Sequence, residues 1–206
     1  MASDGISQKS GIEQTMENRH LKEFLKADLY RYGGAKATSY FFKFLATSFP
    51  GFRYTYLLRH ASAFPKRSIR GLFYRALLRH YSYKYGFQIM PNTRIGKGLY
   101  IGHWGPVIIN GRAEIGDNCT LTHLVTIGQM NRGRREGCPK IGNNVWIGAG
   151  AVVVGKIFIG DNVLIAPNSY VNFDVPSNSI VTGNPAVIKE HANPTEGYAS
   201  FVFSPE

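Results

Sequence analysis

An aliphatic residue returns at every sixth position through most of the second half of the chain, and this period restricts the fold more than any other feature. A period of six matches neither the 3.6-residue turn of an α-helix nor the two-residue alternation of an ordinary strand. It is typical of a solenoid of very short parallel strands, with three hexads to a coil. The residues of this register are Ile95, Ile101, Val107, Ile115, Leu121, Ile127, Ile141, Ile147, Val153, Ile159, Ile165 and Val171. These twelve hexads predict a mainly β fold, a parallel β-helix of about four coils.

The rest of the chain divides at the ends of this repeat. Apolar residues at helical spacing, interrupted by glycine and proline, predict an α-helical region before it. The helical runs are expected at about 16–32, 40–49, 52–63 and 68–83. In the last run, the residues expected on one side are Ile69, Leu72, Phe73, Ala76, Leu77 and Tyr81. The predicted organisation is a flexible N-terminus at 1–15, a basic, aromatic α-helical domain at 16–90, the β-helix at 91–189 with a loop at 129–140, and a C-terminal tail at 190–206.

The formal net charge of +11 lies entirely in the helical part. Residues 1–94 hold 16 Lys and Arg against 5 Asp and Glu, whereas residues 95–206 hold 8 of each sign. A solvated basic face explains this charge, and so does attraction to an anionic membrane surface or a lipid-linked substrate. Nucleic acid is not an expected partner, because no recognition motif accompanies the charge.

The cysteines and the lack of a long apolar run bear on the compartment. Cys119 and Cys138 are too few for a disulfide framework, and Cys119 occupies an inward repeat position suited to a small core residue. No stretch approaches the roughly 18 apolar residues of a membrane span, and the first residues lack the apolar core of a signal peptide. The expected localisation is the cytoplasm, and the basic helices leave open a peripheral position at the inner face of the membrane.

Two histidines occupy equivalent places in the repeat. His103 and His123 are each the third residue of a hexad, three hexads apart, so they are expected on neighbouring coils about 4.8 Å apart. The next two coils place Ala149 and Pro167 in the same column. Imidazole accepts a proton from an alcohol near neutral pH, and a second imidazole nearby disfavours double protonation. The column predicts a proton-handling site that continues into a smooth track for an extended ligand, with two surface histidines as the alternative.

The longest interruption of the repeat is the loop at 129–140. Insertions in solenoids project on one face and often contribute to the binding site. Arg132, Arg134 and Arg135 suit this loop to an anionic ligand, although an exposed basic loop explains them as well.

Four segments together carry a family resemblance: GHWGPVIIN, LTHLVTIG, CPKIGNNVWIGAGAVVVG and VTGNPAVIK. With the hexad repeat and a loop expected on the same side as the histidines, they resemble the serine O-acetyltransferases among the hexapeptide-repeat acyltransferases. The resemblance implies a left-handed parallel β-helix that forms a homotrimer, with pairing of two trimers left open. It also implies acetyl-CoA as co-substrate in the groove between subunits, and no metal.

By this resemblance His103 matches the general base, which deprotonates the acceptor hydroxyl for direct attack on the thioester. His123 is expected to share in catalysis, in place of a histidine that the loop lacks. The positions that the resemblance places along the cofactor are Gln129, Met130, Gly148, Ala149 and Pro167.

Several positions depart from the family pattern. Gly102 stands where the family has an aspartate before the base, and Gln88 stands where it has the aspartate that orients the base. Gly137-Cys138 replaces an arginine-histidine pair linked to acceptor binding. The positions expected to meet the acceptor are Gln88, Trp104, Arg132 and Cys138. Trp104 suits stacking on a sugar face or sealing of a trimer edge.

These departures favour the branch of the family that acetylates sugar hydroxyls in capsular polysaccharide, exopolysaccharide or lipopolysaccharide biosynthesis. The alternative is a serine O-acetyltransferase of cysteine biosynthesis. A zinc-dependent carbonic anhydrase on a similar solenoid would need a third histidine on the coils. A non-catalytic trimeric scaffold or membrane-surface adaptor is the alternative outside enzymology.

Overall fold

A computed structural model describes residues 11–37 and 49–204, with side chains in the first helix from His20 onward. The expected flexible segment at 1–15 is described only from Gly11, which is already helical. The expected helical run at 40–49 lies outside the described residues, except for Phe49. None of the described helices is long and apolar enough to cross a membrane.

Within residues 11–37 and 49–85, three helices and one short turn of 3-10 helix precede the strands. The helical elements are α1 (Gly11–Tyr30), η1 (Gly34–Lys36), α3 (Pro50–Ala63) and α4 (Ile69–Tyr85). Pro50 lies in the first turn of α3, where its missing N–H costs nothing. The Ser68 hydroxyl accepts from the Gly71 N–H at 3.0 Å and caps α4. These elements confirm the helical runs expected near 16–32, 52–63 and 68–83.

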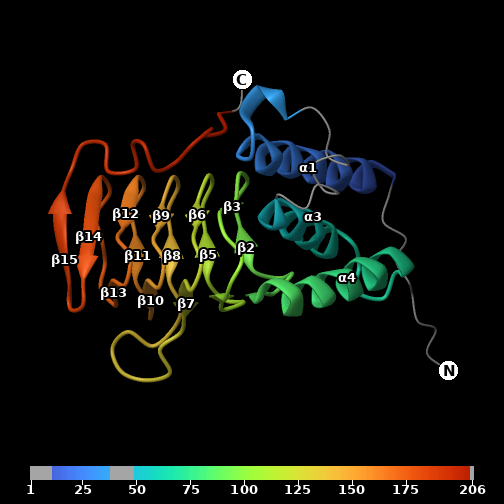
Figure 1. Cartoon of the computed structure of the whole chain (residues 1–206). Helices are drawn as coiled ribbons and strands as arrows, with labels where there is room; N and C mark the ends of the chain where they lie inside the picture. The colour runs from blue at the N-terminus through green and yellow to red at the C-terminus, as the bar shows by residue number, and fades with distance from the viewer. Residues whose placement is uncertain (1–10, 38–48, 205–206) are drawn as a thin grey trace.

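Three parallel sheets form the sides of the solenoid. Sheet A contains β1 (Phe87–Ile89), β4 (Val107–Ile109), β7 (Thr126–Gly128), β10 (Val152–Val154) and β13 (Tyr170–Val171). Sheet B contains β2 (Arg94–Ile95), β5 (Glu114–Ile115), β8 (Lys140–Ile141) and β11 (Phe158–Ile159). Sheet C contains β3 (Tyr100–Ile101), β6 (Thr120–Leu121), β9 (Trp146–Ile147), β12 (Val163–Ile165) and β14 (Ser179–Gly183), and β15 (Ala186–Glu190) joins it antiparallel. The chain visits the three sheets in turn, which confirms the β-helix (Figure 1).

The strand register follows the hexads in sheets B and C. In sheet A, Ile109, and not the expected Val107, pairs with Ile127, because the turn after Ile101 is two residues longer than the turn after Leu121. In sheet C, Ile101 pairs with Leu121, which in turn pairs with Ile147. The aliphatic residues of the repeat are all buried and fill the interior of the coils.

The solenoid extends beyond the predicted hexads at both ends, with β1 added to sheet A before them and β14 added to sheet C after them. Gly86 ends α4 with a φ of 79°, and the buried Phe87 and Ile89 then begin sheet A. Sheet A therefore contains five strands instead of the expected four, and the boundary expected at residue 91 moves to Phe87. The hexad pattern missed β1 because aromatic Phe87 and an adjoining helix obscure its period.

Buried charges fasten the helices to the first coils. Asp28 is fully buried and accepts from Arg59 Nε at 2.8 Å and from the Leu99 N–H at 2.9 Å. Arg31 is also buried, and its Nη1 donates to the carbonyl oxygens of Gly98 at 3.0 Å and Asn118 at 2.7 Å. Part of the positive charge of the helical region is therefore structural and not available to a partner.

Helix α4 is more exposed than its apolar pattern predicts. The expected packing side includes Ile69, Leu72 and Phe73, which are 87%, 58% and 57% exposed. Only Gly71 and Leu78 are fully buried on this helix. The first part of the expected side is therefore exposed, whereas Leu77 and Tyr81 of the same set are half-buried against the core; α4 lies at the outside of the helical layer (Figure 1).

The C-terminal tail runs back over sheet C of its own chain and ends beside α1 (Figure 1). The Tyr198 and Trp146 rings lie 5.0 Å apart, so Trp146 packs against the tail. The Asn118 amide group exchanges hydrogen bonds of 2.8 and 3.0 Å with the backbone of Phe203. The tail therefore joins the solenoid to the helices within one chain.

Candidate active site

The histidine corner is the edge where sheet C turns into sheet A, at residues 102–106, 122–125, 148–151 and 166–169. Its last three turns stack in register, since the Gly150 N–H donates to the His123 carbonyl at 3.1 Å, whereas the first turn, which bears His103, is two residues longer. The Asn168 N–H donates to the Ala149 carbonyl at 2.8 Å. The column expected from the repeat is present and consists of His103, His123, Ala149 and Pro167.

The two imidazoles of this column are in contact. The rings of His103 and His123 lie 5.5 Å apart, edge to face at 89°. His103 is exposed, whereas His123 is half-buried and its Nδ1 has no hydrogen-bond partner among the described residues. Unpaired buried ring nitrogens are rare, and those that persist are often found at functional sites. The pair therefore presents one accessible imidazole beside a second that has an unused ring nitrogen.

The residue after His123 adopts a strained backbone. Leu124 has a φ of 61°, in the left-handed region that a side chain of this kind avoids. The next two turns of the corner use Gly150 and Asn168 at the equivalent positions, and both residue types adopt this conformation readily. Strain of this kind concentrates at functional sites, and here it adjoins the second histidine.

Beyond the histidines the corner becomes small and smooth. Gly148 is buried, and a Cβ at this position would lie 2.6 Å from the Pro167 nitrogen, so the two turns approach too closely for any side chain. Ala149 is half-buried and Pro167 is exposed. On the other side of the pair, Trp104 is 70% exposed beside His103.

The loop corner is the edge where sheet A turns into sheet B, at residues 110–113, 129–139 and 155–157. The loop projects from the solenoid between β7 and β8 (Figure 1). Its stem is closed by paired backbone hydrogen bonds of 2.9 and 3.0 Å between Met130 and Gly137. Arg135 donates to the Asn172 carbonyl and holds the loop to a later coil, whereas Arg132 is exposed.

The other loop residues expected at the site take part in local contacts. Gln129 Oε1 accepts from Arg112 Nη2 at 2.6 Å and from Asn110 Nδ2 at 3.3 Å. Cys138 Sγ donates to Asn110 Oδ1 at 3.4 Å. These contacts fix the base of the loop at the edge of sheet A.

The two corners do not meet within one chain, because sheet A separates them. The histidines precede β4 and β7, whereas the loop follows β7. The expectation that the loop shares a side with His103 is therefore wrong for a single chain. The structure groups His103 with His123, Ala149 and Pro167, and it places Gln129, Met130, Arg132 and Cys138 at the opposite edge.

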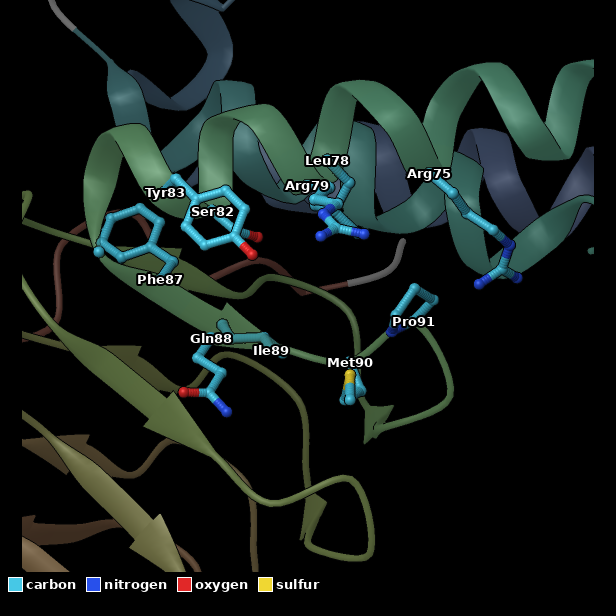
Figure 2. A pocket seen from close by; sticks show the side chains of 11 residues that line it. Arg75, Leu78, Arg79, Ser82, Tyr83, Phe87, Gln88, Ile89, Met90 and Pro91 are labelled. Atoms are coloured by element: carbon cyan, nitrogen blue, oxygen red, sulfur yellow. The ribbon is translucent and has the colours of Figure 1, made fainter.

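Gln88 lies on the outer face of β1, and it lines a cavity of about 710 Å³ between α4 and β1 (Figure 2). The cavity adjoins the histidine corner, since the Gly105 N–H donates to the Tyr85 carbonyl at 3.0 Å. Its walls include Arg75 and Arg79, which the sequence interpretation treated only as scattered charge. Their spacing of four on one helix, directly before β1, is the signal that could have identified them.

Two further predictions concern metal and thiol chemistry. In the described part of the chain, no three His, Cys, Asp or Glu side chains gather to hold a metal. Burial raises the pKa of the Cys119 thiol to about 12, as expected for a core cysteine.

Comparison with known proteins identifies the family. Residues 138–172 match the bacterial transferase hexapeptide (six repeats) family. Serine acetyltransferase from Helicobacter pylori strain 26695 is 38% identical over 138 residues, which cover 67% of this chain and 80% of that protein. The chain belongs to the hexapeptide-repeat acetyltransferases. It is an acyltransferase that uses acetyl-CoA as co-substrate.

Solved structures extend the similarity of this acetyltransferase to the whole fold. Serine acetyltransferase from Brucella abortus strain S19, in complex with coenzyme A, has a TM-score of 0.71 and 31% identity, over 89% of this chain and 72% of that chain. Neisseria gonorrhoeae serine acetyltransferase in complex with serine has a TM-score of 0.67 and 29% identity, over 86% of this chain and 72% of that chain. These relatives support the family and the serine alternative, and they do not support the predicted polysaccharide branch.

Proposed function

We propose that this acetyltransferase transfers the acetyl group of acetyl-CoA to the hydroxyl of L-serine, with His103 as general base. The observation that carries the proposal is the exposed His103 imidazole, held edge-on to His123 at a corner of the solenoid. The acceptor is inferred from the relatives, which are serine acetyltransferases and which this chain matches over most of their length.

The chemistry needs one base and no covalent enzyme intermediate. A ring nitrogen of His103 takes the proton of the acceptor hydroxyl while the oxygen attacks the thioester carbonyl. The tetrahedral intermediate collapses with loss of the coenzyme A thiolate, which takes the proton back from the imidazolium. His123 lies edge to face against this ring, with 5.5 Å between the ring centres, and is the second imidazole that we assign to catalysis. Backbone N–H groups of the corner turns are the candidate donors to the oxyanion.

The extended arm of acetyl-CoA is assigned to the part of the histidine corner that carries small residues. Gly148, Ala149 and Pro167 leave a track without bulky or charged side chains that leads away from His103. A homotrimer completes this groove, because the loop of one subunit then reaches the histidine corner of its neighbour. Gln129 and Met130 are the loop residues that we assign to the cofactor, and Arg132 and Cys138 are those that we assign to the acceptor side.

A saccharide hydroxyl is the second candidate acceptor, and specific residues favour it. Gln88 offers a carboxamide where a carboxylate would orient the base, and Gly137-Cys138 offers no charge for the carboxylate of serine. Trp104 presents an exposed ring beside His103, and such rings stack on sugar faces. A cytoplasmic location accords with either acceptor.

Turnover of acetyl-CoA, measured as released thiol, tests the proposal. L-serine is compared with a panel of sugars and nucleotide sugars, and the His103→Ala protein serves as the control for enzyme-independent release. Release with L-serine supports the proposal, whereas release with a saccharide alone transfers it to the second candidate. Failure to bind coenzyme A, measured by calorimetry, would contradict the activity itself.

A further inference from the structure

The cavity between α4 and β1 has a strongly positive surrounding. Its lining contains Arg75, Arg79, Ser82, Tyr83 and Gln88, and no acidic residue (Figure 2). From Leu29 to Ala113 the sequence has no aspartate or glutamate at all. A concave site lined by charge of one sign concentrates ligands of the other sign.

The two arginines keep donors available. Arg75 Nη2 donates to the Ala61 carbonyl at 2.6 Å, but its Nε–H is buried without a hydrogen-bond partner in the described part of the chain. Arg79 is exposed, and its guanidinium carbon lies 5.9 Å from the centre of the Tyr83 ring. Both guanidinium groups project from α4 on the side that faces β1 (Figure 2). Guanidinium pairs of this kind suit carboxylate and phosphate groups.

The cavity lies on the acceptor side of the histidine pair. Its wall residue Gly86 is so close to the turn that bears His103 that an added Cβ would lie 3.1 Å from the Pro106 nitrogen. The smooth track runs from His123 through Ala149 to Pro167, toward the later coils and away from α4. An acceptor that approaches His103 from the side opposite the cofactor therefore passes this cavity.

We propose that the cavity binds the acidic group of the acceptor, a carboxylate or a phosphate, through Arg79 with support from Arg75. This inference rests on the proposed acetyl transfer, because that transfer defines which side of His103 the acceptor occupies. A cavity of about 710 Å³ lies within the roughly 300–1,000 Å³ range of ligand sites. It has room for the carboxylate of serine and also for a phosphorylated or acidic sugar.

Matched pairs of acidic and neutral acceptors test the assignment. The pairs are L-serine with L-serinamide, glucose 6-phosphate with glucose, and glucuronate with glucose. Arg79→Gln is expected to raise the KM for the acidic member about 10- to 100-fold, the effect of losing one charge-assisted pair. The KM values for the neutral member and for acetyl-CoA are expected to change less than about twofold. The pair of acceptors that shows the effect identifies whether the cavity binds a carboxylate or a phosphate.

Arg70→Gln is the control, because it removes an exposed arginine from the same helix outside this cavity. We expect it to behave as the unmodified protein does. Equal effects of the two substitutions, or equal loss for acidic and neutral acceptors, would overturn the proposal and leave only a general charge effect.

A binding measurement separates this proposal from the acceptor assignment. Inorganic pyrophosphate is titrated by calorimetry into the protein saturated with coenzyme A, at low and high salt. We expect binding that weakens with salt and falls about tenfold in Arg79→Gln but not in Arg70→Gln. Absence of this difference would overturn the cavity assignment whatever the turnover shows. Its presence in a protein that acetylates none of the acceptors would leave an anion site in the cavity, but it would refute the proposed function and the assignment of that site to the acceptor.

Discussion

The histidine corner and the loop corner lie on either side of sheet A, but their turns differ in regularity. The histidine corner is the more regular of the two: its first turn holds two extra residues, but the pairing just before that turn still places His103 and His123 in one column. At the loop corner one turn is extended into a hairpin whose stem pairs Met130 with Gly137. In the site that we propose, the regular corner positions the reacting groups, and the longer loop of the other corner extends toward the ligands.

The strongest test of the difference between the two corners is to replace His103, the proposed base of the histidine corner. We expect His103→Ala to lower acetyl transfer by about 10²–10⁴-fold, the range for loss of a general base. The melting temperature is expected to stay unchanged, because His103 is exposed and makes no core contact. His123→Ala in the same assay separates the two imidazoles, and near-normal turnover in His103→Ala would transfer the base assignment to His123.

The loop corner is tested by shortening it without opening its stem. Replacement of residues 131–136 by Asn-Gly keeps the Met130–Gly137 pair and removes the arginines of the tip. We expect a loss of at least about tenfold in kcat/KM, because charged loop contacts to the ligands are removed.

Mixing then shows whether the two corners meet between chains. The shortened-loop protein and His103→Ala are unfolded together in equal amounts and refolded. If each site takes His103 from one subunit and the loop from its neighbour, randomly mixed trimers would regain about a quarter of the sites. A restored site needs a shortened-loop chain beside a His103→Ala chain in the right order. No recovery in correctly assembled mixed trimers would contradict a site shared between subunits.

The same contrast explains which parts of the molecule could be predicted. The aliphatic hexads predicted the column of His103, His123, Ala149 and Pro167, because a repeating backbone carries register from coil to coil. The corner occupied by the loop was not predicted. Counting hexads assigns residues to the three sheets, but it does not show whether a loop and a histidine lie at the same edge. The exposed apolar side of α4 was missed because a helical pattern shows a face without showing what covers it.

Two features of the site had no clear signal in the sequence. The cavity depends on the distance between α4 and β1, which no local pattern encodes. The strain at Leu124 depends on the turn that its coil imposes, and it is recognised only by comparison with Gly150 and Asn168. Tertiary geometry decides both features.

This strain offers a smaller test of the regular corner. Leu124→Asn places a residue that tolerates a φ of 61°, at a position that is 52% exposed and loses little packing. We expect a gain of about 1 kcal/mol in the free energy of unfolding and a rise of a few degrees in melting temperature. The reverse change, Asn168→Leu, is expected to lower both quantities. Lower turnover in the more stable Leu124→Asn would indicate that the strain helps to position His123.

The smallest effect is expected at Cys138, beside the loop corner. The direct transfer proposed for His103 gives this thiol no covalent role, so Cys138→Ser is expected to keep turnover within about twofold. Thiol titration supplies the structural control, because the pKa of buried Cys119 is raised to about 12 and this residue should react only after unfolding. A large loss of turnover, together with an acetylated Cys138 trapped in the absence of acceptor, would contradict direct transfer and give the loop corner the reacting group.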